Sequence, residues 1–209
     1  AVNKLADRLS TIASWDSTRD GIRNTFGRQA IPMVWDFAEV NPFSESSGSF
    51  LNGIDWIAKA VEHAPANRAA YCSMMDATTA LLNTQERVIC TDPPYYDNIG
   101  YAELSDFFYI WLRRSLKTVF PTLFSTVLVP KERELVATPY RHGNKAKADE
   151  FFFFFMVAAL KLMREKSDGE FPVVIYYALK QSESKDEGVY STGWATFLDA
   201  IISAKFAIT

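Results

Sequence analysis

Short apolar runs alternate with longer segments of helical periodicity along the 209-residue chain, and this alternation constrains the fold more than any other feature. The runs at 71–75, 87–90 and 171–179 are rich in apolar, aromatic or β-branched residues, which predicts buried strands. Apolar residues at helical spacing predict helices over 52–63, 104–119, 149–166 and 192–204. Alternating strands and helices predict an α/β fold with a mostly parallel sheet.

The composition fits one domain over residues 1–209 with a sizeable core, since 48% of the residues are hydrophobic. Residues 1–65 are expected to form a helical lead-in to it. Cys72 and Cys90 lie in apolar runs without metal-ligand spacing, which favours buried, reduced thiols in a cytoplasmic protein and no metal site. No signal peptide or membrane-length apolar stretch is present, so we expect no membrane partner.

The formal net charge of -3 argues against nucleic-acid binding through overall charge. A local contact is still open, because the irregular stretch 121–148 is the one basic part of the chain. Its position between two predicted core strands suits a target-recognition insertion, and a solvated loop explains it equally well. The candidate nucleic-acid contacts there are Lys131, Arg133, Arg141 and Lys145.

The run 88–97, VICTDPPYYD, ends a predicted strand on a stiff and polar corner. Ligands of open α/β sheets bind outside the carboxyl ends of the strands, which is where Asp92 falls. Pro93 and Pro94 have fixed φ angles and no N–H, so nearby carbonyls are left pointing outward as acceptors. Tyr95 adds an aromatic face, and acceptors beside such a face suit a flat ring that carries an exocyclic amine.

Asp92-Pro93-Pro94-Tyr95 resembles the DPPY motif of methyltransferases that use S-adenosylmethionine (AdoMet) to methylate exocyclic amines, chiefly N6 of adenine in DNA. The runs TDPPYYDNIGYAELSDFFYIWLRR, RQAIPMVWDFAEVNPF and GVYSTGWATFLDAI extend the likeness over about residues 3–209. Together they resemble the poorly characterised adenine-specific DNA methylases with a zinc ribbon. The resemblance implies a Rossmann-like AdoMet methyltransferase sheet that is incomplete in this chain.

The resemblance also implies roles at the corner. Asp92 and the Pro93 carbonyl would accept hydrogen bonds from the target amine, which aims the nitrogen lone pair at the methyl group on sulfur. Tyr95 would stack on a base flipped out of the duplex, and Tyr96 beside it is a further candidate contact to nucleic acid.

On the cofactor side, the resemblance places Asp76 and Ala77 where an acid ends the third strand and holds the adenine of AdoMet. A helix cap is the alternative for Asp76. Asp36 and Asn41 are weaker candidates for cofactor binding.

One part of the family pattern is absent: none of the nine glycines forms a G-x-G pair, and no C-x-x-C pair could build a zinc ribbon. The first two strands of the family's sheet are not recognisable either. We therefore expect this chain to correspond to the carboxyl-terminal half of the family, with an amino-terminal half or a partner chain supplying the glycine-rich turn. By itself the chain is expected to bind AdoMet weakly or not at all.

Methylation of adenine in DNA is thus the leading hypothesis. Methylation of a ribosomal RNA base or of a protein glutamine stays open, because related corners serve those substrates. A third hypothesis is a non-catalytic interaction module descended from such an enzyme.

Overall fold

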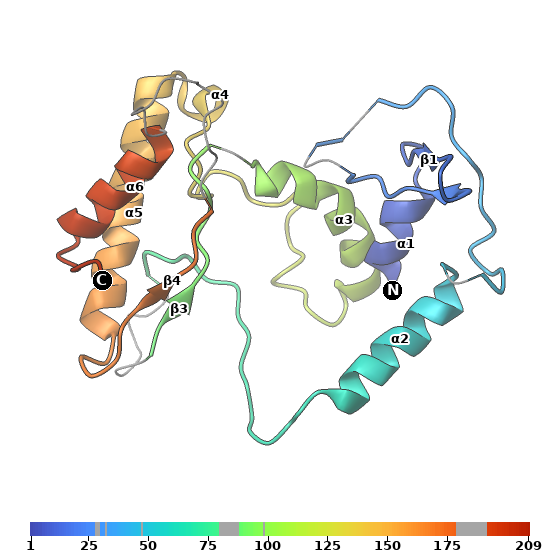
Figure 1. Ribbon diagram of the computed structural model, residues 1–209, viewed down its shortest axis with the longest axis horizontal. Coiled ribbons are helices and arrows are strands. Elements are labelled where there is room, and N and C mark those ends of the chain that lie inside the picture. The colour runs from blue at the N-terminus through green and yellow to red at the C-terminus, as the bar shows by residue number, and fades with distance from the viewer. Residues whose placement is uncertain (28–29, 32, 47, 80–87, 98, 179–191) are drawn as a thin grey trace. The chain divides into compact units, whose positions relative to one another are not determined.

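The computed structural model describes residues 1–27, 30–31, 33–46, 48–79, 88–97, 99–178 and 192–209, which gather into two compact units (Figure 1). Unit 1 comprises Ala1–Cys72 and Tyr101–Val129, and unit 2 comprises Ser73–Gly100 and Pro130–Thr209. The single domain predicted over residues 1–209 stays a prediction. The insertion predicted at 121–148 is divided between the units after Val129.

Unit 1 is built from helices α1 (Val2–Leu9), α2 (Phe50–His63) and α3 (Tyr101–Leu116), with α1 contacting the other two. The helix predicted over 52–63 is confirmed as α2, whose first turn is capped by the Ser49 side chain accepting from the amide of Asn52 at 3.3 Å. The helix predicted over 104–119 is confirmed as α3, which begins three residues earlier.

The helical lead-in is only partly correct, because α1 ends at Leu9 and an antiparallel pair follows, β1 (Trp15–Asp16) and β2 (Gly21–Ile22). The Asp16 carboxylate accepts from the amide and the hydroxyl of Thr18, which stabilises a turn in place of a helix. Asp20 completes the turn with a φ of 46°, a value that a continuing helix does not allow.

Unit 2 holds the parallel pair β3 (Cys90–Thr91) and β4 (Val174–Ile175), the short helix α4 (Pro139–His142), and the helices α5 (Lys145–Lys166) and α6 (Thr192–Ser203). Cys90 is in register with Val174 and Thr91 with Ile175. Figure 1 shows α5 and α6 lying along one another, and their contact carries the core. Its largest fully buried side chains are Phe152, Phe197 and Leu160.

The mixture of helices and small sheets is compatible with the predicted α/β class, and Cys90–Thr91 pairs in parallel with Val174–Ile175 where two of the strands were predicted. The run at 71–75 is not a strand, and its side chains lie in solvent, with Tyr71 97% exposed. Among the described residues the parallel sheet therefore has two strands, and a larger Rossmann-like sheet remains an expectation.

The prediction of two buried cysteines is wrong, since Cys72 and Cys90 are both exposed. A parallel sheet normally has both faces covered by helices. Here Ile175 and Tyr177 pack on the core of unit 2, whereas Val174 and Tyr176 are exposed, so Cys90 lies on a pair with an open side. In the described part of the chain, no helix combines the length and the apolar character needed to cross a bilayer.

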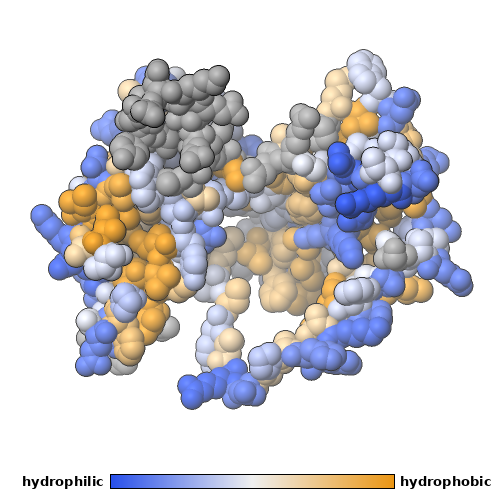
Figure 2. Space-filling view, viewed as in Figure 1, coloured by the Kyte–Doolittle hydropathy of each residue, from blue (hydrophilic) through white to orange (hydrophobic). Residues whose placement is uncertain are grey.

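Two phenylalanines of the Phe151–Phe155 run lie on opposite faces of α5, one on the core face and one on the exposed face. Phe152 is fully buried, whereas Phe154 is 65% exposed. Figure 2 shows apolar surface in orange over the part of unit 2 that holds α5 and α6, where Ile202 is also exposed. The run is thus partly core and partly surface.

We expect Phe152→Ala to lower the free energy of unfolding by about 3–5 kcal/mol, because it removes a buried ring and leaves a cavity. Phe154→Ala on the same helix should change it by no more than about 0.5 kcal/mol, apart from the small gain in helix propensity. Urea unfolding followed by circular dichroism measures both. Equal effects of the two substitutions would contradict the assignment of faces.

Candidate functional site

The Asp92 corner follows β3 directly and leaves the sheet at its carboxyl end. Asp92 is exposed, and Pro93, Pro94 and Tyr95 are half-buried. The Tyr95 hydroxyl donates a hydrogen bond of 2.8 Å to Oδ1 of Asp92. The corner is closed by the amide of Tyr96, which donates to the carbonyl of Pro94 at 3.2 Å.

Tyr96 has a φ of 41°, which is unusual for a bulky residue and costs about 1–2 kcal/mol. Its burial offsets that cost: the residue is 5% exposed, and its ring meets Phe152 edge-on at a centroid distance of 5.1 Å. The hydroxyl donates to Asp149 Oδ1 at 2.5 Å, and the carbonyl accepts from the amide of Ala137 at 2.8 Å. Burial first, and then the bond to Asp149, raise the pKa of this hydroxyl. Tyr96 therefore belongs to the core of unit 2. The sequence analysis expected it to contact nucleic acid, and its burial does not suit that role.

A cavity of about 620 Å³ lies beside the corner within unit 2. Its volume is in the range of roughly 300–1,000 Å³ typical of small-molecule sites. The predicted site residues that line it are Asp76, Ala77, Asp92, Pro93, Pro94 and Arg133. Side chains of α5 add an apolar wall through Phe151, Phe155, Met156 and Met163. The structure thus brings the predicted acceptor residues and the main predicted cofactor residues to one cavity.

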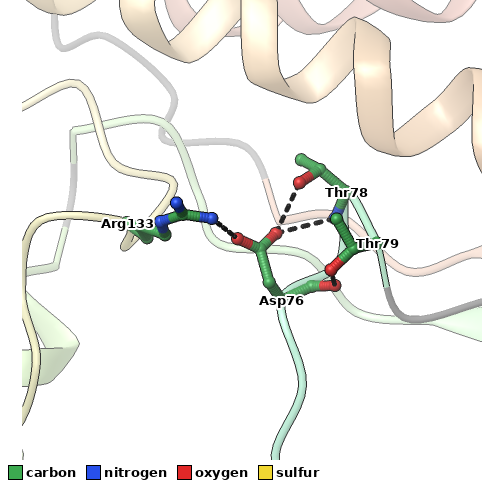
Figure 3. A network of polar contacts seen from close by, with 4 residues as sticks. All are labelled: Asp76, Thr78, Thr79 and Arg133. Carbon is green, nitrogen blue, oxygen red and sulfur yellow. Dashed lines mark hydrogen bonds and ion pairs between the residues drawn. The ribbon is translucent and has the colours of Figure 1, made fainter.

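Asp76 is an acid of that cavity with hydrogen bonds to both carboxylate oxygens, and Figure 3 shows its carboxylate between Thr78 on one side and Arg133 on the other. Oδ1 accepts from the Thr78 hydroxyl at 2.6 Å and from the Thr78 amide at 2.9 Å. Oδ2 accepts from Nη1 of Arg133 at 2.8 Å. These contacts, with the Thr78 hydroxyl first, lower the pKa of Asp76 to about 2. The acid is therefore ionised at neutral pH, and it caps a turn at Thr78 rather than a helix.

The basic stretch is less available to nucleic acid than its composition indicated. Arg141 forms an ion pair with Glu134 at 2.7 Å, in which both side chains are largely buried. Arg133 points its guanidinium at Asp76, although 82% of its side chain is exposed. Lys131 is half-buried and its carbonyl accepts from Arg141, whereas Lys145 is exposed at the start of α5. Arg141 thus stabilises its own loop. Of the four predicted contacts, Lys145 and Arg133 have the side chains most exposed to solvent.

The weaker cofactor candidates belong to unit 1 and line no part of this cavity. Asp36 is exposed. Asn41 is exposed too, and its side-chain oxygen accepts from the amide of Phe43 at 3.0 Å, which makes it a turn residue.

Three contributors to the site had no assigned role in the sequence analysis: Thr78, Glu134 and Tyr177. The pattern Asp76-Ala77-Thr78 carries a usable signal, since an acid followed two residues later by Thr favours a side-chain-capped turn. Glu134 and Tyr177 carry none, because their partners Arg141 and Tyr95 are remote in sequence or on another element.

Comparisons with protein-family models, with curated proteins and with solved structures return no match to this chain. In the part of the chain that the structure describes, no three His, Cys, Asp or Glu side chains are grouped as metal ligands. The candidate site therefore has to be interpreted from its own geometry.

The Asp76 network predicts a specific pH response. Because the pKa of Asp76 is lowered from 3.8 to about 2 in the folded protein, its contribution to stability is present above about pH 4 and is lost as the pH falls toward 2. Thr78→Val should raise the pKa of Asp76 and reduce that loss, since the strongest hydrogen bond to the carboxylate is removed. Carboxyl-carbon NMR titration measures this pKa.

Thr79→Val is the matched control, because the Thr79 hydroxyl donates to the Asp76 carbonyl and leaves the carboxylate alone. An Asp76 pKa that stays near 2 in Thr78→Val, or rises equally in both variants, would contradict the network.

Proposed function

We propose that this chain is the acceptor-side part of an AdoMet-dependent amino-methyltransferase that methylates N6 of adenine in DNA. The observation that carries the proposal is the cavity at the end of β3, which is lined both by Asp92-Pro93-Pro94 and by Asp76-Ala77. A polar corner at the carboxyl end of a parallel strand is where ligands of α/β proteins bind. Asp36 and Asn41 have no part in this proposal.

The acceptor groups of the corner suit an exocyclic amine. Asp92 Oδ2 and the carbonyl of Pro93 would each accept one N–H of the amine, so that its lone pair points away from both. Pro93 and Pro94 keep this arrangement fixed, because their φ angles do not vary. Asp92 is also a base at the same position and would take up the proton that the amine loses after methylation. Fixed acceptors of this kind stabilise a developing positive charge without reorganisation.

The cavity also has features that fit the cofactor, whose contribution is a methyl group on a positively charged sulfur. Asp76 is ionised, and Oδ2 with its one bond from Arg133 retains a lone pair to accept from the adenine amine of AdoMet. The apolar wall of Phe151 and Phe155 suits the flat face of the same ring. The methionine part would need the glycine-rich turn, which we assign to an amino-terminal half or a partner chain.

The DNA would be held by local charge rather than by the acidic protein as a whole. Lys145 and Arg133 are exposed cations of the basic stretch, and Arg133 lines the cavity. Contacts of this kind position a duplex without reading its sequence.

The test is transfer of tritium from labelled AdoMet to unmethylated duplex DNA by the full-length gene product. Asp92→Ala should reduce the rate about 100-fold or more, as expected for loss of a preorganised group that stabilises the transition state. Asp199→Ala is the matched control, because Asp199 is an exposed acid of α6 that does not line the cavity.

Parallel reactions with ribosomal RNA and with protein substrates separate the alternatives. Transfer that depends on Asp92 but goes to RNA or to protein would replace DNA as the substrate. If the folded wild-type protein transfers no tritium to any of the three substrates, the proposed enzyme activity is wrong, and a non-catalytic interaction module is favoured.

A further inference from the structure

Tyr95 is held at both ends of its side chain. Its hydroxyl donates to Oδ1 of Asp92 at 2.8 Å. Its ring meets Tyr177 edge-on, with the centroids 5.3 Å apart and the planes at 69°. A tyrosine that served only as a stacking face would need neither contact.

The contact with Tyr177 ties the ring of Tyr95 to the core of unit 2. Tyr177 stacks on Phe197 at a centroid distance of 4.0 Å with the planes 9° apart, and Phe197 is 1% exposed. Trp194 flanks the same pair at 5.9 Å from Tyr177. Trp194 and Phe197 of α6 and Tyr177, which follows β4 by two residues, thus form an aromatic column that holds the Tyr95 ring and sets the direction in which its hydroxyl points.

The hydroxyl in turn fixes the carboxylate. A hydrogen bond from a phenol to a carboxylate is charge-assisted and stronger than a neutral one. With Oδ1 engaged, rotation of the carboxylate about its Cβ–Cγ bond is restricted, and Oδ2 accepts no hydrogen bond from the described residues. Oδ1 of Asp92 is therefore held by Tyr95, while Oδ2 is available to accept a hydrogen bond from a ligand.

We propose that Tyr95 is a positioning residue, whose hydroxyl holds Asp92 so that Oδ2 faces the incoming amine. This inference rests on the proposed methyltransferase function and deepens it. It assigns to the hydroxyl a role separate from any stacking of the Tyr95 ring on a base.

Tyr95→Phe separates the two roles, because it removes the hydroxyl and keeps the ring. We expect kcat to fall about tenfold, the size of effect that loss of one hydrogen bond to a charged group gives, while KM for DNA changes by less than about twofold. Tyr95→Ala should lower kcat as much and also raise KM, since the ring is lost too. Tritium transfer from AdoMet to unmethylated duplex DNA by the full-length gene product measures both constants.

Tyr176→Phe is the matched control, because Tyr176 is a 62% exposed tyrosine beside β4 that does not line the cavity. It should leave both constants unchanged. Unchanged kcat in Tyr95→Phe, or a change confined to KM, would overturn the positioning role and leave stacking as the explanation.

A second measurement does not depend on turnover. Thermal unfolding midpoints of wild type, Tyr95→Phe, Asp92→Ala and the double variant form a cycle that isolates the Tyr95–Asp92 contact. We expect the double variant to lose less than the sum of the two single losses. If the wild-type protein transfers no methyl group to any substrate, the proposed function fails, and additive midpoint shifts would then overturn the Tyr95–Asp92 contact as well.

Discussion

The burial of Tyr96 is the interaction on which the rest of the site depends. This one residue contacts three other parts of unit 2: its ring meets Phe152 of α5 and Gly193 of α6, and its backbone carbonyl accepts from the amide of Ala137. The contact with Gly193 is so close that a Cβ at position 193 would come within 2.7 Å of the Tyr96 ring, so only glycine fits there. Asp92 to Tyr95 precede this anchor in the chain. A corner of exposed and half-buried residues is thereby fixed to the largest hydrophobic core that the structure describes.

The parallel pair of β3 and β4 supplies the second constraint. Cys90 and Thr91 pair with Val174 and Ile175, so both strands run toward the same edge. Tyr95 and Tyr177 lie just beyond that edge and meet there. Two segments more than 80 residues apart in the chain thus contribute the acid and the aromatic column that orients it. The pairing covers two residues on each strand, so the surrounding helices and aromatic contacts must stabilise it.

The role of each arginine in the basic stretch of unit 2 depends on the acid that it pairs with. The two arginines of the basic stretch face different acids: Arg141 is nearly buried against Glu134, and Arg133 reaches Asp76 from solvent. The Arg141–Glu134 pair stabilises the loop that carries it, because removing one member would leave the other as a buried, unpaired charge. The second pair, after the stronger effect of the Thr78 hydroxyl, helps to lower the pKa of an acid at the wall of a cavity. A cluster of like charges in sequence therefore divides into a structural and a site-facing residue.

The sequence by itself determined the helices at 52–63, 104–119, 149–166 and 192–204 and the polar corner at Asp92, because periodicity and proline chemistry are local properties. It also determined the candidates Asp76 and Ala77, which line the cavity with Asp92. Only the tertiary structure decided that Tyr96 is core, that Arg141 is paired, and that the apolar run at Tyr71–Met75 lies in solvent. Those outcomes depend on contacts between residues distant in sequence, and an apolar run or a basic residue reads the same whether or not such a partner reaches it.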